Sequence, residues 1–180
     1  MRAQVDAWLA ELFPNAKVNA EQLAGLSLAK TTFNLGRSFN LGRSNDWRRP
    51  SNVGYGLSYA FPLLVALICA APGQMVIVDS PEAHLHPRAQ SVMGRILAWF
   101  AAAGVQVIVE SHSDHLLSGV RLSVREGLLR ADKAAVHFFG STSKGEKAFR
   151  EKIAIAEDGS IANWPEGFFD QAIADLIGLS

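Results

Sequence analysis

The stretch MVIVDSPEAHLHPRAQ, residues 75–90, passes from a short β-branched run directly into acids and histidines. Its first four residues are typical of a central parallel strand, which Asp79 ends. The stretch VQVIVESHSDHLL, residues 105–117, repeats the pattern: its expected strand ends at Glu110, and His112 follows two residues later. Ligands of open parallel sheets bind beyond the carboxyl ends of the strands, so both polar clusters are expected at one edge of a sheet.

The rest of the chain alternates helical and strand patterns. This predicts an α/β fold, with a mainly parallel sheet flanked by helices, a C-terminal β-hairpin and a closing helix. Pro62 is expected in the first turn of its helix, where a missing N–H loses no partner. Helices are expected over 5–13, from about Leu57 to Ala71, over 87–104, over 114–129 and within 166–179; strands are expected over 75–78, 105–110, 134–140 and on both sides of Asp158-Gly159.

Composition sets broad limits on the function. The 180 residues suffice for one domain with a core, and 17 basic residues balance 17 acidic ones, so net charge favours no nucleic-acid partner. The single cysteine, Cys69, cannot form an internal disulfide, and no signal peptide opens the chain, so a reduced cytoplasmic setting is expected. The longest apolar run, 60–72, is too short to span a membrane.

The hexapeptide FNLGRS occurs at 33–38 and again, unchanged, at 39–44. Two copies match no structural repeat, so we interpret them as a duplication tolerated in an exposed loop or hairpin. The alternative is a patch of arginines that contacts phosphates. Its members would be Arg37, Arg43, Arg48 and Arg49.

Three motifs stand in a characteristic order along the chain. NVGYGLS (52–58) precedes a helix, SPEAHLHP (80–87) follows the strand that ends in Asp79, and VIVESHSDHLL (107–117) comes last. In this order they resemble the signature motif, the D-loop after a Walker B strand and the switch histidine of ABC-type ATPases. The resemblance is to the RecF, SMC and OLD-nuclease kind within the AAA family, and it implies a P-loop NTPase fold.

The segment DGSIANWPEGFFDQ (158–171) further resembles a small domain of unknown function that is appended to one bacterial subgroup of these ATPases. The whole resemblance covers roughly residues 50–178. It divides the chain into an N-terminal helix and loop region (1–50), an ATPase lobe (51–140) and a C-terminal appended region (141–180).

The resemblance implies roles for particular residues. Asp79 would hold Mg²⁺, and His112 would contact the γ-phosphate of ATP. Ser80 stands where these ATPases usually carry the catalytic glutamate, so Glu82 becomes the candidate base and slow hydrolysis is expected. Nucleotide contacts are implied for Gly54, Gly56, Ser58 and His84.

The sequence contains no G-x-x-x-x-G-K-[ST] motif. GSTSKGEK (140–147) comes nearest, but Glu146 occupies the lysine position and no hydroxyl residue follows Lys147. A P-loop provides most contacts to the α- and β-phosphates. ATP binding is therefore expected only in an assembly with a P-loop-bearing half or a homologous subunit, and a DNA or nuclease effector would complete it. Whether the chain is a fragment, a split-gene half or a decayed product stays open.

Two other functions fit the same residues. A degenerate ATPase half could serve as a non-enzymatic interaction module. A metal-dependent hydrolase could use the acids and histidines as ligands, although Pro81 separates the histidines from the strand. Its ligands would come from Asp79, Glu82, His84, His86, Glu110, His112 and Asp114.

Overall fold

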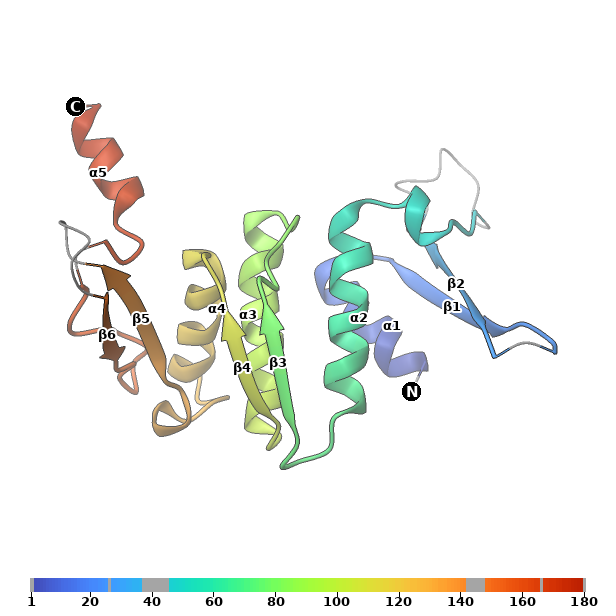
Figure 1. The fold of residues 1–180 in the computed structure, drawn as a ribbon, viewed down its shortest axis with the longest axis horizontal. Coiled ribbons are helices and arrows are strands. Elements are labelled where there is room, and N and C mark those ends of the chain that lie inside the picture. Colours follow the sequence, from blue (N-terminus) through green and yellow to red (C-terminus); the bar gives the residue numbers. More distant parts are fainter. Residues whose placement is uncertain (1, 26, 37–45, 142–147, 166, 180) are drawn as a thin grey trace.

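The computed structural model describes residues 2–25, 27–36, 46–141, 148–165 and 167–179, in a mixed α/β arrangement (Figure 1). The FNLGRS repeat lies mostly outside these residues, as do Arg37 and Arg43. The elements are α1 (Arg2–Leu12), β1 (Lys17–Gln22), β2 (Ala29–Asn34), η1 (Pro50–Asn52), α2 (Tyr55–Cys69), β3 (Met75–Asp79), α3 (Pro87–Ala102), β4 (Gln106–Glu110), α4 (Asp114–Arg125), η2 (Ala131–Lys133), β5 (Val136–Ser141), β6 (Ala148–Ile153) and α5 (Gln171–Gly178). No helix within the described ranges is both long and apolar enough to cross a membrane.

The strands form separate pairs instead of the expected mainly parallel sheet. Within the described residues, β3 and β4 form a parallel pair, whereas β1–β2 and β5–β6 are antiparallel pairs (Figure 1). Neighbouring strands can pair antiparallel across a short connection, while a parallel pair needs a crossover such as α3. The expectation of a C-terminal β-hairpin agrees with β5–β6, but Asp158-Gly159 does not join two strands. It lies in a turn that the Ala156 N–H closes on the Ser160 carbonyl, at 2.9 Å.

The parallel pair takes its geometry from the β3–α3–β4 crossover. The register runs from Met75 opposite Gln106 to Asp79 opposite Glu110, so the two strands end level with each other. Pro87 begins α3 at the position where a missing N–H costs nothing. The sequence pattern therefore delivers both polar strand ends to one edge.

Helices α3 and α4 approach each other through glycines. A Cβ atom on Gly94 would lie 2.1 Å from the Leu116 carbonyl oxygen, and one on Gly119 would lie 2.0 Å from the Ser91 carbonyl oxygen. Both distances are far below van der Waals contact, so no larger residue fits at either position without moving a helix backbone.

Two apolar cores hold the elements together. The larger packs α1, α2 and α3 against each other and against β2, and it includes Leu9, Phe33, Leu64 and Met93. The smaller joins α4 to β6 and to the C-terminal segment around Phe168. Folding therefore fixes the C-terminal region on the helix that follows His112.

Helix α2 departs from one expectation. It begins at Tyr55, with Gly54 at the N-cap, and Pro62 lies inside it and not in its first turn. The Pro62 side chain is exposed, whereas Leu57, Ala60, Leu64 and Leu67 are buried on the other side. The helix thus tolerates proline on its solvent side, where water can satisfy a carbonyl that loses its donor.

One face of the β3–β4 pair is uncovered. The half-buried valines at 76, 107 and 109 pack against the core, while the alternate side chains are exposed, Ile77 by 73% and Ile108 by 45%. Parallel strands are usually covered on both faces. An apolar sheet surface therefore runs toward the carboxyl ends of β3 and β4.

Candidate functional site

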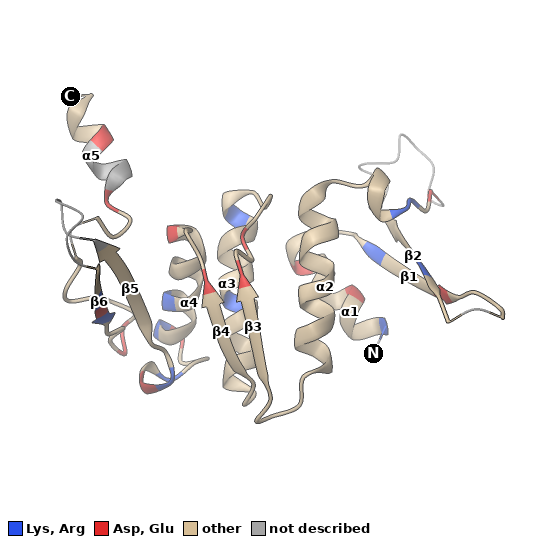
Figure 2. Cartoon of the chain, viewed as in Figure 1, with Lys and Arg blue, Asp and Glu red and all other residues tan. Residues whose placement is uncertain are grey.

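Two carboxylates lie side by side at the ends of the parallel strands. Asp79 and Glu110 are register partners, and both are exposed. Figure 2 shows acidic residues at the ends of β3 and β4. The Ser80 hydroxyl lies between them, 2.9 Å from Asp79 Oδ1 and 3.3 Å from Glu110 Oε2. Ser80 adopts φ +48°, and its N–H donates to the Glu110 carbonyl at 3.0 Å, so β4 fixes the chain as it leaves β3.

This arrangement favours a charged Asp79. The hydrogen bond with Ser80 lowers the pKa of Asp79 most, followed by the hydrogen bond with Glu110. Partial desolvation opposes these two effects, and the charge of His112 makes the smallest contribution, which also lowers the pKa. Asp79 is thus an ionised acid at neutral pH.

His112 is held by two glutamates. Its Nε2 atom lies 3.0 Å from Glu110 Oε1, and its backbone N–H donates to Glu82 Oε1 at 2.8 Å. The imidazole itself is 87% exposed. The strand ends therefore bring Asp79 and His112 to the same edge, with Glu110 between them.

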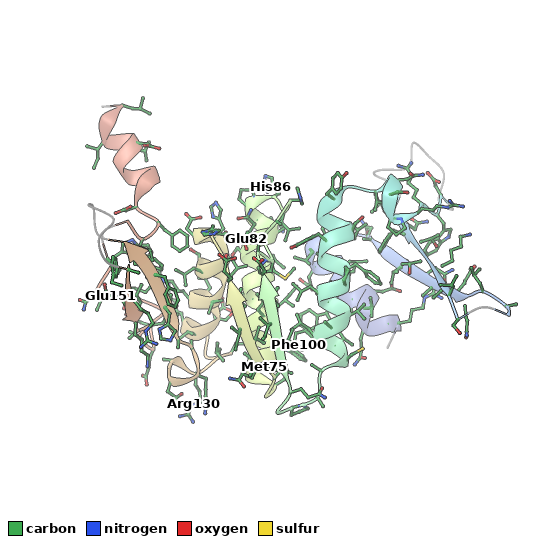
Figure 3. All side chains as sticks on the ribbon, viewed as in Figure 1. Met75, Glu82, His86, Phe100, Arg130 and Glu151 are labelled. Atoms are coloured by element: carbon green, nitrogen blue, oxygen red, sulfur yellow. The ribbon has the colours of Figure 1, made fainter. Side chains whose placement is uncertain are left out.

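Glu82 lies at this edge, in the turn between β3 and α3 (Figure 3). Its Oε2 atom is buried and accepts no hydrogen bond from any described residue. A buried carboxylate oxygen without a donor is unfavourable, so this atom has unused capacity to accept one. Sequence reasoning placed Glu82 near the site, but not its bond to the His112 backbone.

His84 lies against the start of α2. It adopts φ +60°, and its ring centre lies 5.4 Å from that of Tyr55 and 6.4 Å from that of Tyr59. A Cβ atom on Gly56 would come within 2.7 Å of the His84 carbonyl oxygen, so glycine is required there. Two of the sequence-predicted nucleotide contacts, Gly56 and His84, are therefore neighbours.

The other two predicted contacts, Gly54 and Ser58, lie in the first turn of α2. Gly54 is its exposed N-cap, and the Ser58 hydroxyl donates to the Pro50 carbonyl at 2.9 Å. The Tyr59 hydroxyl donates to the Asp79 carbonyl at 3.3 Å. This contact ties the predicted signature segment to the carboxyl end of β3.

A polar relay that sequence reasoning missed joins the turn to α4. Gln90 donates to the Leu85 carbonyl at 2.9 Å and accepts from the Ser113 hydroxyl at 2.7 Å. The Ser113 hydroxyl also caps α4 by accepting from the Leu116 N–H at 3.0 Å. The signal available in the sequence was a serine directly before a helix.

His86 has a local structural contact. Its Nδ1 atom accepts from the Arg88 N–H at 3.4 Å as the N-cap of α3. His84 and His86 thus face different neighbours. Among the described residues, no group of three or more His, Cys, Asp or Glu side chains could hold a metal ion, so the seven-residue ligand set of the hydrolase alternative is not brought together.

The donors at the edge nonetheless fit Mg²⁺. This ion is typically bound by one or two carboxylates, with water and phosphate oxygens completing its shell. Asp79 and the adjacent Glu110 are exposed carboxylates of this kind.

Three solved structures similar to this chain are of SMC ATPases, and two of them are described as SMC heads. One, from work on ATP-driven dimerization and DNA-stimulated activation of SMC ATPases, has a TM-score of 0.57 at 12% identity and covers 98% of this chain and 90% of its own. An SMC head bound to the C-terminal winged-helix domain of ScpA has a TM-score of 0.59 at 12% identity, over 86% of this chain and 42% of its own. The Smc head with an extended coiled coil, bound to the C-terminal domain of ScpA from Pyrococcus furiosus, has a TM-score of 0.54 at 12% identity. The match covers 99% of this chain and 37% of that structure's chain. At such identities the likeness concerns the fold.

Sequence comparison with families is more specific. No curated protein matches the chain. The family described as "AAA domain, putative AbiEii toxin, Type IV TA system" matches residues 5–118, and "Protein of unknown function (DUF3696)" matches residues 129–179. With the motif order at the edge of β3 and β4 and the SMC-head fold, these matches show that the chain belongs to this AAA family of ABC-type ATPases, of the RecF, SMC and OLD kind, and carries the DUF3696 region.

Proposed function

We propose that this chain is the C-terminal lobe of an ABC-type ATPase, which binds and hydrolyses ATP only when a P-loop-bearing half or partner subunit completes it. The observation that supports this most is the uncovered apolar face of β3–β4, which leads to Asp79 and Glu110. A two-stranded sheet with an open apolar face gains stability when another element covers it. A partner on this face would also reach the carboxylates.

The residues at the edge suit distinct roles in that assembly. Asp79 is ionised and exposed, so it would hold Mg²⁺, which when bound neutralises charge on phosphate oxygens. His112 presents an exposed imidazole for the γ-phosphate. Glu82 is the candidate base, because its Oε2 has no donor among the described residues and can accept from a water.

The remaining contacts would come from the opposite subunit's nucleotide. The Gly54–Ser58 turn, including Gly56, would close over ATP bound there, and His84 would approach it from the D-loop. In this proposal the ATPase lobe spans 51–140, after an N-terminal region (1–50), and 141–180 is the appended region. A homologous subunit and a DNA or nuclease effector are the proposed partners, in the cytoplasm.

A second candidate is a non-enzymatic interaction module. The chain has no P-loop sequence, and the uncovered face of β3–β4 would bind a partner without hydrolysis. The two functions differ in whether the completed assembly turns over ATP.

The test measures ATP turnover and complex formation. The chain is assayed alone and with a P-loop-bearing half of an ATPase of the same family, and light scattering reports the complex. We expect no turnover by the chain alone and turnover in the complex, which His112→Ala removes. Ile77→Asp should prevent assembly. The control Leu28→Asp, at an exposed site in the connection between β1 and β2, should not.

Each result decides between the candidates. A complex that never turns over ATP would favour the interaction module. Turnover by the chain alone at an ordinary ATPase rate, abolished by His112→Ala, would refute the requirement for a second half.

A further inference from the structure

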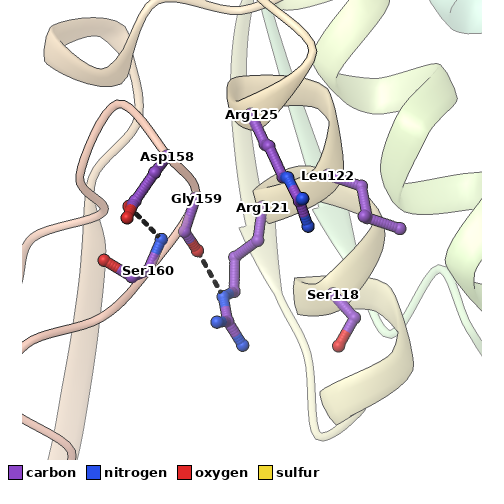
Figure 4. Close-up of a pocket in the computed structure, with 7 residues that line it drawn as sticks. All are labelled: Ser118, Arg121, Leu122, Arg125, Asp158, Gly159 and Ser160. Carbon is purple, nitrogen blue, oxygen red and sulfur yellow. Dashed lines mark hydrogen bonds between the residues drawn. The ribbon is translucent and has the colours of Figure 1, made fainter.

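A pocket of about 400 Å³ lies between α4 and the turn at 156–160, at the end of α4 remote from His112 (Figure 4). Its lining includes Ser118, Arg121 and Arg125 from one side of the helix, which are spaced so that they share a face. The turn contributes Asp158, Gly159 and Ser160.

Arg121 is fixed in position at this pocket. Its Nε atom donates to the Gly159 carbonyl at 2.8 Å (Figure 4). Its guanidinium also lies 5.7 Å from the centre of the Trp164 ring. These contacts use the Nε–H and one face of the guanidinium. Among the described residues no acceptor contacts the two terminal nitrogens, so their donors are left for a ligand, and little side-chain freedom would be lost on binding.

Arg121 and Arg125 differ from two nearby arginines, Arg95 and Arg130, in their electrostatic partners. Arg95 is paired with Glu126 and Arg130 with Asp132. Among the described residues, no carboxylate lies within ion-pair distance of Arg121 or Arg125. The pocket thus contains two guanidiniums that have no anionic partner in contact.

The acid of the pocket, Asp158, offsets only one of these two charges, and the charge of Arg125 is one of the causes that lower its pKa. Asp158 Oδ1 accepts from the Ser160 N–H at 2.9 Å, so the carboxylate is engaged within its own turn. The lining therefore carries two positive charges and one negative charge. A basic residue in the last turn also offsets the negative end of the α4 dipole, which explains Arg125 alone but not the second arginine held beside it.

We propose that this pocket binds a phosphate group, whose oxygens are contacted by Arg121 and Arg125 and by the hydroxyl of Ser118. Planar guanidiniums and hydroxyl donors match phosphate oxygens in charge and geometry. The proposal is independent of ATP hydrolysis, since none of these residues belongs to the edge of β3 and β4.

The experiment follows the amide NMR spectrum of the full chain as inorganic phosphate, and separately pyrophosphate, is added at constant ionic strength. We expect saturable shifts at Ser118, Gly159 and Ser160. Arg125→Ala removes charge-assisted hydrogen bonds and should weaken binding roughly tenfold, with Arg125→Lys intermediate. Arg130→Ala is the matched control, because it removes the same charge from an arginine outside the pocket.

A further arm identifies the source of the phosphate. If duplex DNA produces the same shifts and inorganic phosphate competes with it, the ligand is a nucleic-acid backbone; if only pyrophosphate binds, it is a small anion. Both results support phosphate recognition. Phosphate binding in this pocket would be refuted if the shifts saturated with none of the probes. It would also be refuted if Arg125→Ala and Arg130→Ala weakened binding equally. Because Arg121 also anchors the turn, Arg125 is the position varied.

Discussion

The backbone N–H of His112 donates a 2.8 Å hydrogen bond to Oε1 of Glu82, a residue 30 positions earlier in the chain. This bond joins the turn after β3 to the segment after β4. The two motifs that the sequence placed at one edge are therefore connected directly, and their positions depend on each other.

Replacing Glu82 by alanine should loosen the segment that contains His112. The variant loses one hydrogen bond to a charged acceptor, so local protection of the His112 amide should fall by about 1 to 2 kcal/mol. Hydrogen exchange at that amide measures the effect. Glu157→Ala, at an exposed carboxylate in the C-terminal turn, is the control, and equal exchange in both variants would contradict the role of Glu82.

Gly94→Ala should strongly destabilise the chain. The new methyl group would meet the Leu116 carbonyl at 2.1 Å, so α3 and α4 would have to separate, and overpacking of this kind costs about 3 kcal/mol. Chemical denaturation gives the free energy of unfolding. Gly178→Ala, where a Cβ atom meets nothing within 4 Å, should leave it nearly unchanged.

Ser80→Ala should raise the pKa of Asp79 toward its usual value of 3.8, because the Ser80 hydrogen bond is the main cause of the lowered pKa. A lowered pKa in the folded state adds stability above pH 3.8, and that stability is lost as the pH falls through the pKa of the folded state. The variant should therefore lose less stability on acidification. Carboxyl-carbon NMR titration tests this. Asp132, whose pKa is lowered mainly by Arg130, serves as the internal control and should not change.

Ile77→Thr should change the free energy of unfolding by less than about 0.5 kcal/mol, because its side chain is 73% exposed. Leu64→Ala, in the fully buried core, should cost about 3 kcal/mol in the same denaturation experiment. A large loss for Ile77→Thr at low protein concentration would show that the β3–β4 face is covered within the chain.

The sequence was most informative where a local pattern ends abruptly. The β-branched runs predicted β3 and β4, and the acids and His112 that follow them lie at one edge because parallel strands end together. Pro87 likewise marked the start of α3. These features depend on residues that are close in the chain.

Features set by distant contacts were missed or misjudged. The β1–β2 hairpin falls where no pattern was visible, because β1 is mostly exposed and shows little alternation of apolar and polar residues. The mainly parallel sheet was overestimated, since β5 pairs with β6 and not with β4 within the described residues. The bond between Glu82 and His112, like the relay through Gln90, joins segments whose proximity no local pattern encodes.

The glycine contacts between α3 and α4 have a mechanical consequence. With backbone against backbone at Gly94 and Gly119, sliding one helix along the other would press backbone atoms together, so we expect the two helices to shift as one block. The loop that leads into α3 and the loop that leads into α4 would then move together. A displacement of His112 would swing the far end of that block, and the C-terminal turn fastened to Arg121 would travel with it.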